Sequence, residues 1–235
     1  MDVLIGIVVC ALFGLFSYRA DILNRKGSVM SFVLGLLVCF SSGLYWLLLL
    51  IFFVLICYIA TIAKKEEKIK RHWSVKESIR GENNVVANGI VPIVIAVLSF
   101  LNRPVMGLCY ITAIAAASSD TFASEIGILS DDVYLITTIK KTRVGTDGGV
   151  SPLGEAAALL GAFIMALLGW LLVFQFDPAY AFKALFYPTV FGFLGCQIDS
   201  LLGAVFERRG QLTKGGVNFL SIAATTLLSS LFYIF

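Results

Sequence analysis

The chain has 235 residues, of which 59% are apolar and only 14% charged, and its mean hydropathy is +0.92. This composition is too apolar for a soluble globular domain and predicts an integral membrane protein. The net charge of +3 is explained by the loop asymmetry described below, so no nucleic-acid partner is expected. Five cysteines without C-x-x-C spacing and a single histidine argue against a disulfide framework and a zinc site.

Apolar runs of membrane-spanning length predict an all-α, polytopic helix bundle that occupies residues 1–235 as a single domain. The first run has no basic residue before it and three just after it, so we expect an uncleaved helix rather than a signal peptide. About eight transmembrane helices are predicted, over roughly residues 2–19, 28–42, 44–62, 84–101, 104–124, 152–175, 183–206 and 214–235.

The second run, 28–42, is short for a membrane span, and a re-entrant segment is the open alternative there. Of the 18 Lys and Arg residues, all but Arg103 and Lys183 fall in the first, third, fifth and seventh gaps between the runs. Eight crossings put these four gaps on one side, and a re-entrant second run would segregate the charge less well. The positive-inside rule then predicts cytoplasmic motif gaps with both termini outside.

The third gap, within the cytoplasmic interfacial segment 64–82, mixes Lys and Glu with Ile69, Trp73 and Ile79. This pattern suggests a helix that continues from the third span and lies along the membrane surface, with Trp73 at headgroup level. A solvated linker that anchors to anionic lipid explains the same pattern. We therefore assign no chemistry to the segment.

Two carboxylates lie near the cytoplasmic ends of predicted spans, Asp120 in the fifth and Asp199 in the seventh. A carboxylate at membrane depth is costly and usually functional. Paired carboxylates beside basic residues suit Mg²⁺ that carries a nucleotide or diphosphate, since Mg²⁺ takes one or two carboxylates and keeps phosphate oxygens. Glu125 is a third candidate metal ligand, and Asp131 with Asp132 is expected to form a solvated turn. The alternative for each acid is pairing with a Lys or Arg.

The fifth gap forms a cytoplasmic motif loop, 125–151, that is the most phosphate-like stretch of the chain. Its glycines permit turns whose N–H groups face an anion, and it leads into a helix with Ser151 as the expected N-cap and Pro152 as the first residue. Lys141 and Arg143 are expected to act beside the aspartates in catalysis. A Walker loop is absent. Expected contacts to substrate or nucleotide here and beside the two aspartates are Ser124, Gly145, Thr146, Asp147, Gly148, Gly149, Ser151 and Ser200.

Two other cytoplasmic stretches also combine glycines with basic or amide side chains. Asn84 and Asn88 stand one helical turn apart before Pro92, and Arg208 and Lys214 precede the last helix. We include these four among the candidate nucleotide or substrate contacts. For Arg25 and Lys26, anchoring and ligand contact remain equal alternatives.

Three segments carry a family resemblance: 118–130, 137–154 with its Gly-Thr-Asp-Gly-Gly-Val-Ser core, and Asp199-Ser200-x-x-Gly-Ala. They resemble the integral-membrane family of domain of unknown function 92, which contains plant phytyl-phosphate kinase and transmembrane protein 19. The resemblance spans nearly the whole chain and implies a polyprenyl-phosphate kinase, which makes an isoprenoid diphosphate from the monophosphate. A more distant similarity to CTP-dependent polyprenol kinases and phosphatidate cytidylyltransferases favours CTP as the donor.

The expected mechanism holds a prenyl monophosphate, its tail between helices, beside a Mg²⁺-bound nucleoside triphosphate. A phosphate acceptor is already ionised near neutral pH, so no strong general base is needed. Two alternatives stay open: a cytidylyltransferase that forms a CDP-lipid, and a transporter or lipid scramblase in which the two aspartates bind a coupling ion. We expect a multi-pass protein of the cell membrane, and a homo-oligomer remains open.

Overall fold

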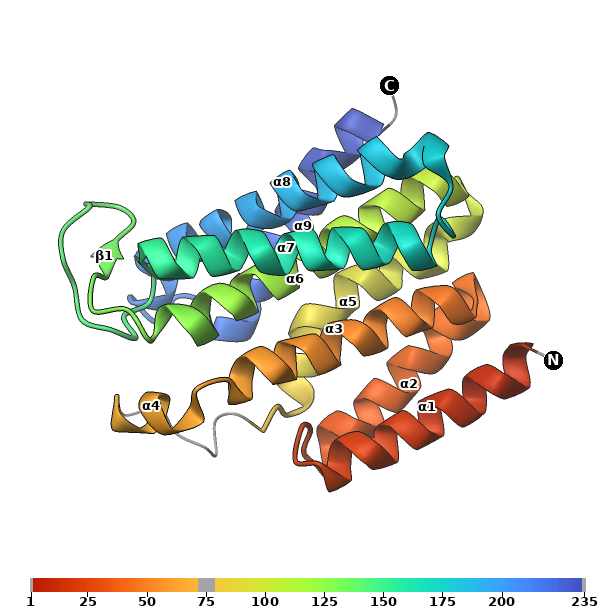
Figure 1. Ribbon diagram of the computed structural model, residues 1–235, viewed down its shortest axis with the longest axis horizontal. Coiled ribbons are helices and arrows are strands. Elements are labelled where there is room, and N and C mark those ends of the chain that lie inside the picture. The colour runs from red at the N-terminus through yellow and green to blue at the C-terminus, as the bar shows by residue number, and fades with distance from the viewer. Residues whose placement is uncertain (1, 72–78, 234–235) are drawn as a thin grey trace.

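A computed structural model describes residues 2–71 and 79–233 of the chain. The described residues form the expected all-α bundle of membrane-protein type, with eight long helices (Figure 1). These are α1 Asp2–Arg19, α2 Arg25–Ser42, α3 Leu44–Ile62, α5 Glu82–Val97, α6 Arg103–Gly127, α7 Pro152–Leu172, α8 Pro178–Leu202 and α9 Lys214–Tyr233. The shorter elements are α4 Lys65–Lys70, η2 Leu98–Phe100, β1 Tyr134–Leu135, β2 Gly149–Val150 and the π-helical turn η3 Gly203–Glu207.

The long helices run back and forth along one axis, so that the start of α1 and the end of α9 lie toward the same end of the bundle (Figure 1). We call this the terminal end and the opposite one the loop end. Helix α2 extends between the two ends, and its 18 residues measure about 27 Å at 1.5 Å per residue. The re-entrant alternative for the second run is therefore not what the structure shows. Among the residues that the structure describes, seven helices are long and apolar enough to cross a membrane, and α1 falls short with an apolar stretch of Leu4–Arg19.

Helix α6 is the centre of the bundle. In the apolar stretch of α6, 78% of the residues are buried, whereas 33% are buried in α2 and 39% in α3. Small side chains allow this packing: a Cβ added to Gly192 of α8 would lie 2.8 Å from Ala115, and one added to Gly161 of α7 would lie 2.8 Å from Phe122. Close contact with α7, α8 and α9 fixes the end of α6 that carries Asp120.

Several helix starts follow from local capping. The Ser151 hydroxyl accepts a hydrogen bond from Gly154 N at 3.1 Å and Pro152 opens α7, as predicted. Helix α8 begins at Pro178, five residues earlier than the predicted residue 183, because Asp177 caps it through the N–H of Ala179. An Asp followed by Pro is a signal for the start of a helix, and a prediction from the apolar pattern alone does not use it.

The interfacial segment differs from its prediction. Helix α3 ends at Ile62, and Lys64 adopts a left-handed conformation with φ of 51°, so α4 does not continue α3. Residues 72–78, which include Trp73, lie outside the described residues, and the expectation for that side chain stays a prediction.

Candidate functional site

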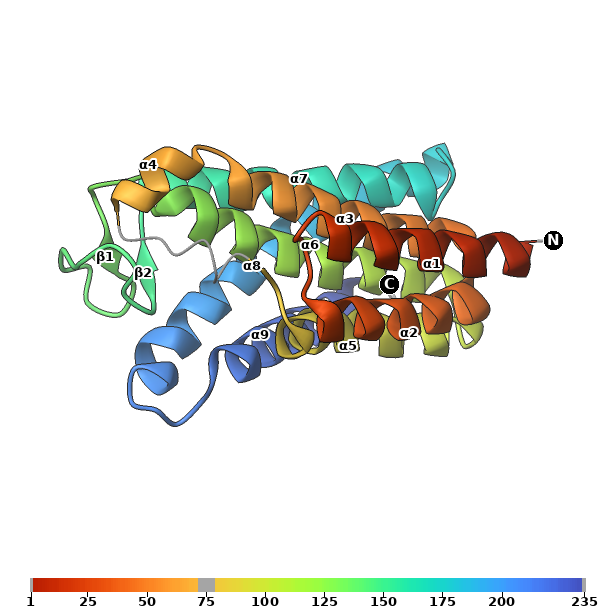
Figure 2. The same ribbon diagram turned by 90° about the horizontal axis from the view of Figure 1, so that it is seen from below.

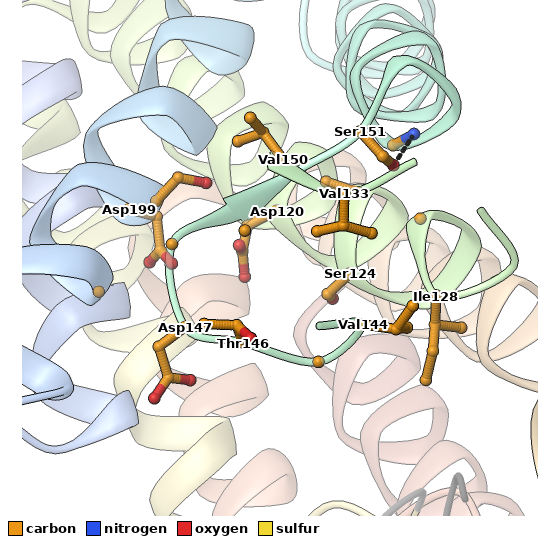
Figure 3. A pocket seen from close by; sticks show the side chains of 18 of the residues that line it. Asp120, Ser124, Ile128, Val133, Val144, Thr146, Asp147, Val150, Ser151 and Asp199 are labelled. Atoms are coloured by element: carbon orange, nitrogen blue, oxygen red, sulfur yellow. Dashed lines mark hydrogen bonds between the residues drawn. The ribbon is translucent and has the colours of Figure 1, made fainter. Parts of the chain in front are cut away.

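The loop end contains a pocket of about 230 Å³ between α6, the motif loop, α7, α8 and α9 (Figure 3). Figure 2 shows the β1–β2 hairpin, α4 and the connection from α8 to α9 at this same end. Eleven of the residues proposed from the sequence line the pocket: Asp120, Ser124, Gly145, Thr146, Asp147, Gly148, Gly149, Ser151, Asp199, Ser200 and Lys214.

Asp199 is held by a defined set of donors. Its side chain is only 4% exposed; Oδ1 accepts a hydrogen bond from Nζ of Lys214 at 3.1 Å, and Oδ2 accepts one from the Ser221 hydroxyl at 3.1 Å. With the Asn218 amide nitrogen turned toward the carboxylate, Nδ2 donates to Oδ2 of Asp199 at 3.2 Å and to the Lys214 carbonyl at 3.0 Å. All three donor residues belong to α9. Helix α9 therefore fixes the carboxylate that α8 supplies.

Asp120 faces the same space from α6 (Figure 3). Its carboxylate is partly exposed and has no hydrogen-bond or ion-pair partner within 2–71 and 79–233. A half-buried carboxylate without a protein donor, opposite a second carboxylate, offers oxygen ligands of the kind that Mg²⁺ takes. No group of three or more His, Cys, Asp or Glu side chains is placed to hold a metal in the part of the chain that the structure describes. The two carboxylates therefore suit a Mg²⁺ ion whose other ligands are phosphate oxygens and water. They do not form a site in which the protein supplies every ligand.

The motif loop closes the pocket and packs against α8. Gly145 and Gly148 both have positive φ, +80° and +73°. A Cβ on Gly148 would overlap Ala204 and lie 2.6 Å from the Ser200 carbonyl oxygen, whereas one on Gly145 would meet nothing within 4 Å. Gly149 lies in β2, where a Cβ would come 2.8 Å from the Thr146 carbonyl oxygen. Glycine is thus required at 148 by both conformation and contact.

Backbone hydrogen bonds hold the loop in its conformation. Strand β1 pairs antiparallel with β2, and Ile136 N donates to Gly148 O at 3.0 Å. Gly149 N donates to Thr146 O at 2.8 Å. The N–H groups of Asp147 and Gly148, in contrast, have no hydrogen-bond acceptor among the described residues, although both residues line the pocket. These two N–H groups are candidate donors to an anion, because they have no protein acceptor within the described chain and belong to residues that line the pocket.

Lys141 and Arg143 do not line the pocket, contrary to the prediction that they act beside the aspartates. Nζ of Lys141 binds Oδ1 of Asp132 at 2.8 Å on the outer face of the hairpin, and both side chains are more than 60% exposed. This hydrogen bond raises the pKa of Lys141. The Arg143 side chain is exposed and makes no hydrogen bond or ion pair with another described residue. Asp131 is also paired rather than merely solvated, to Arg71 at 2.7 Å.

Glu125 points away from the pocket and is not placed as a third metal ligand. Its Oε2 accepts from Nζ of Lys68 at 3.0 Å and its Oε1 from the Thr61 hydroxyl at 3.0 Å. The Lys68 side chain is fully buried and also donates to the carbonyls of Ala60 and Thr61. Neighbouring residues on a helix point about 100° apart, so Ser124 lines the pocket while Glu125 binds α3 and α4.

Three other proposed contacts also lie elsewhere. Asn84 and Asn88 line a separate cavity of about 40 Å³ between α2, α3 and α5, and Nδ2 of Asn88 donates to Asn84 O at 3.0 Å. Arg208 follows η3, is exposed, and does not line the pocket. These three residues lie at the loop end, as predicted, but they do not line the pocket that contains Asp120 and Asp199.

Two acidic side chains of the pocket were missed from the sequence, Glu155 of α7 and Glu207 of η3. Glu155 accepts a hydrogen bond from Nε2 of Gln197 at 2.7 Å. The spacing of Glu207 could have indicated its place in the pocket. Asp199, Gly203 and Glu207 are four residues apart in turn, so they fall on one face of a helix. The π-helical turn that carries Glu207 is also an element that frequently occurs at functional sites.

The bundle and its pocket define a polytopic membrane protein with an acidic, glycine-rich site at one end. The model of the family "integral membrane protein DUF92" matches residues 8–229, and the chain belongs to this family. The resemblance seen in the sequence motifs is thereby confirmed.

Three relatives illustrate the spread of the family. The chain is 34% identical over 231 residues to an uncharacterised membrane protein of Methanocaldococcus jannaschii, covering 97% of this chain and 93% of the relative. It is 28% identical over 277 aligned positions to Protein PGR of Arabidopsis thaliana, covering 96% and 94%. It is 28% identical over 220 residues to the chloroplastic Protein VTE6 of Arabidopsis thaliana, covering 89% and 65%. No solved structure matches the chain.

Proposed function

We propose that this protein is a polyprenyl-phosphate kinase that transfers the γ-phosphate of a nucleoside triphosphate, with CTP favoured, to an isoprenoid monophosphate. The observation that carries the proposal is the meeting of Asp120, Asp199 and the glycine loop in one pocket at the loop end. The chain belongs to the family that its motifs resemble, and the isoprenoid-phosphate substrate class is what that resemblance implies.

Asp120 and Asp199 are the residues that would hold Mg²⁺, since both face the pocket and Asp120 has no protein donor within the described chain. Bound there, Mg²⁺ would neutralise the charge of the phosphate oxygens and help to align the donor. Glu125 is not part of this proposal, because its carboxylate is bound to Lys68.

The other groups of the pocket position and neutralise phosphates. Lys214 supplies an ammonium group, and the N–H groups of Asp147 and Gly148 supply backbone donors. An oxygen of the prenyl phosphate attacks the γ-phosphorus, and the bond from that phosphorus to the β,γ-bridging oxygen breaks. The products are a prenyl diphosphate and a nucleoside diphosphate. No side chain needs to remove a proton, because the acceptor phosphate is ionised near neutral pH.

The proposed setting is the cell membrane, with the loop end in the cytoplasm and the prenyl tail between the helices. The segregation of Lys and Arg to the loop end supports this orientation. Single cysteines introduced at residues 2 and 147 in intact cells test it with an impermeant probe. Labelling at 147 combined with protection at 2 contradicts the orientation.

Product analysis tests the activity. Purified protein in lipid nanodiscs is incubated with geranylgeranyl or phytyl monophosphate, CTP and Mg²⁺, with ATP and GTP in parallel. We expect a prenyl diphosphate and CDP. A CDP-prenyl product with pyrophosphate would instead assign a cytidylyltransferase. No product with any of the three donors would contradict the kinase and favour a transporter or scramblase.

A further inference from the structure

The charge of the pocket is unusual for a site that receives a triphosphate. Its wall in the described chain carries five carboxylates and a single cationic side chain, Lys214. The carboxylates are those of Asp120, Asp147, Glu155, Asp199 and Glu207. Like charges at close range repel, so this wall opposes a free triphosphate and attracts a divalent cation.

Lys214 and Asp199 differ sharply in how firmly they are held. The carboxylate of Asp199 is nearly inaccessible and is bound from its other oxygen by Ser221 and Asn218, both buried on α9. The Lys214 side chain is 55% exposed, stands at the first residue of α9, and has one hydrogen bond among the described residues, to Asp199. A lysine ammonium is a point charge on a flexible stem, so it can leave Asp199 while the carboxylate stays in place.

We propose that Lys214 is a mobile counter-ion, which neutralises Asp199 until a divalent cation binds there and then moves to a phosphate oxygen of the triphosphate. The proposal rests on the proposed function for the identity of the phosphate ligand. Lysine and cation then compete for one carboxylate, so the free cation binds weakly and the triphosphate enters with its cation. Cation binding at Asp199 and triphosphate binding at Lys214 are therefore coupled. The cation releases Lys214 from Asp199, and the phosphate gives the released ammonium group a new partner.

The test measures binding rather than turnover. Mn²⁺ is titrated into the full-length, detergent-solubilised protein without nucleotide, and free Mn²⁺ is followed by electron paramagnetic resonance. Binding of Mn²⁺ with the β,γ-methylene analogue of CTP is then measured by calorimetry. For Lys214→Gln we expect Mn²⁺ affinity to rise by at least about threefold, since a competing cation is removed. Affinity for the Mn²⁺–analogue complex should fall by at least about 10-fold, since a charge-assisted hydrogen bond is lost.

Lys70→Gln is the matched control. Lys70 is exposed on α4 at the loop end, makes no hydrogen bond or ion pair within the described residues, and loses the same charge. Both affinities should stay within about twofold in this variant. Lys214→Arg keeps the charge and provides a second variant if Lys214→Gln does not fold; its free Mn²⁺ affinity should remain as weak as that of the unmodified chain.

Each outcome decides the proposal. A rise in Mn²⁺ affinity together with a loss of analogue affinity supports it. Unchanged or weaker Mn²⁺ binding in Lys214→Gln overturns it, because lysine then does not compete with the cation. Tighter Mn²⁺ binding with unchanged analogue binding also overturns it, because the ammonium then never reaches the phosphates. Both affinities are measured without turnover. A failure of this proposal can therefore be distinguished from a failure of the kinase proposal, which product analysis tests.

Discussion

Helices α3 and α9 both cross the bundle, but their buried faces have opposite chemistry. The buried residues of α3 are almost all apolar, whereas those of α9 include Asn218, Ser221, Thr225, Thr226 and Ser229. Two of these polar side chains on α9, Asn218 and Ser221, bind Asp199. The region of α6 to α9 therefore holds the candidate site, and α1 to α3 present mainly an apolar surface.

The outer surface of the first region supports this division. Leu4, Leu12, Leu15 and Phe16 of α1 are all more than half exposed, as expected of side chains that face lipid. The two regions are tied together at the loop end through the ion pair of Lys68 and Glu125, between α4 and α6. Substitutions in each region and in this tie should therefore have different consequences.

The largest effect is expected from the two aspartates. Asp120→Asn and Asp199→Asn should each lower kcat/KM by at least about 100-fold, because the shape is kept while a ligand charge is lost. The measurement is prenyl diphosphate formation over a range of Mg²⁺ concentrations. Asp21→Asn is the control from the first region: Asp21 is exposed at the loop end with φ of 53°, which Asn tolerates. Near-normal turnover of either pocket variant at limiting Mg²⁺ would remove that residue from the metal site.

A smaller effect is expected from the glycine loop, where two positions give a matched pair. Gly148→Ala should raise the KM for nucleotide by at least about 10-fold, because the new methyl group would overlap Ala204 and push the loop from α8. Gly145→Ala has the same backbone strain, about 1–2 kcal/mol, but open space around it. Steady-state kinetics with both substrates would show whether the difference holds. Equal KM values for the two variants would mean that contact with α8 does not position the loop.

The sequence predicted the elements well and the partners of side chains less well. Apolar runs and the Ser151-Pro152 cap depend on near neighbours along the chain, and they led to the helices that the structure shows. The distribution of Lys and Arg over the whole chain grouped the motif loops at one end. Asp120 and Asp199 stood out because acids in apolar spans are rare, and the loop glycines because they combine with basic residues and a capped helix start. The partner of Glu125, in contrast, is 57 residues away on α4. Such a choice depends on the rotation of packed helices, which composition and spacing do not fix.

Glu125→Gln should affect stability more than catalysis. Removal of one charge from this buried ion pair with Lys68 should cost roughly 3 kcal/mol or more. The melting temperature in detergent should fall, while the Mg²⁺ concentration for half-maximal activity stays within about twofold. Glu67→Gln is the control, since the one ion pair of Glu67 among the described residues is an exposed one with Lys64 at 3.5 Å. A selective shift in Mg²⁺ dependence with an unchanged melting temperature would restore Glu125 as a metal ligand.

The smallest effect is expected outside the pocket, at Lys141 and Arg143. Lys141→Gln breaks an exposed pair with Asp132, and exposed pairs contribute little and are screened by salt. Arg143→Gln changes an exposed side chain that does not line the pocket. Both variants should keep the KM for nucleotide and for prenyl phosphate within about threefold, measured at low and at physiological ionic strength. A 10-fold rise in KM for Arg143→Gln that disappears in high salt would show that the guanidinium reaches the bound phosphates. In that case the outer face of the hairpin, and not only the pocket between α6 and α9, would belong to the site.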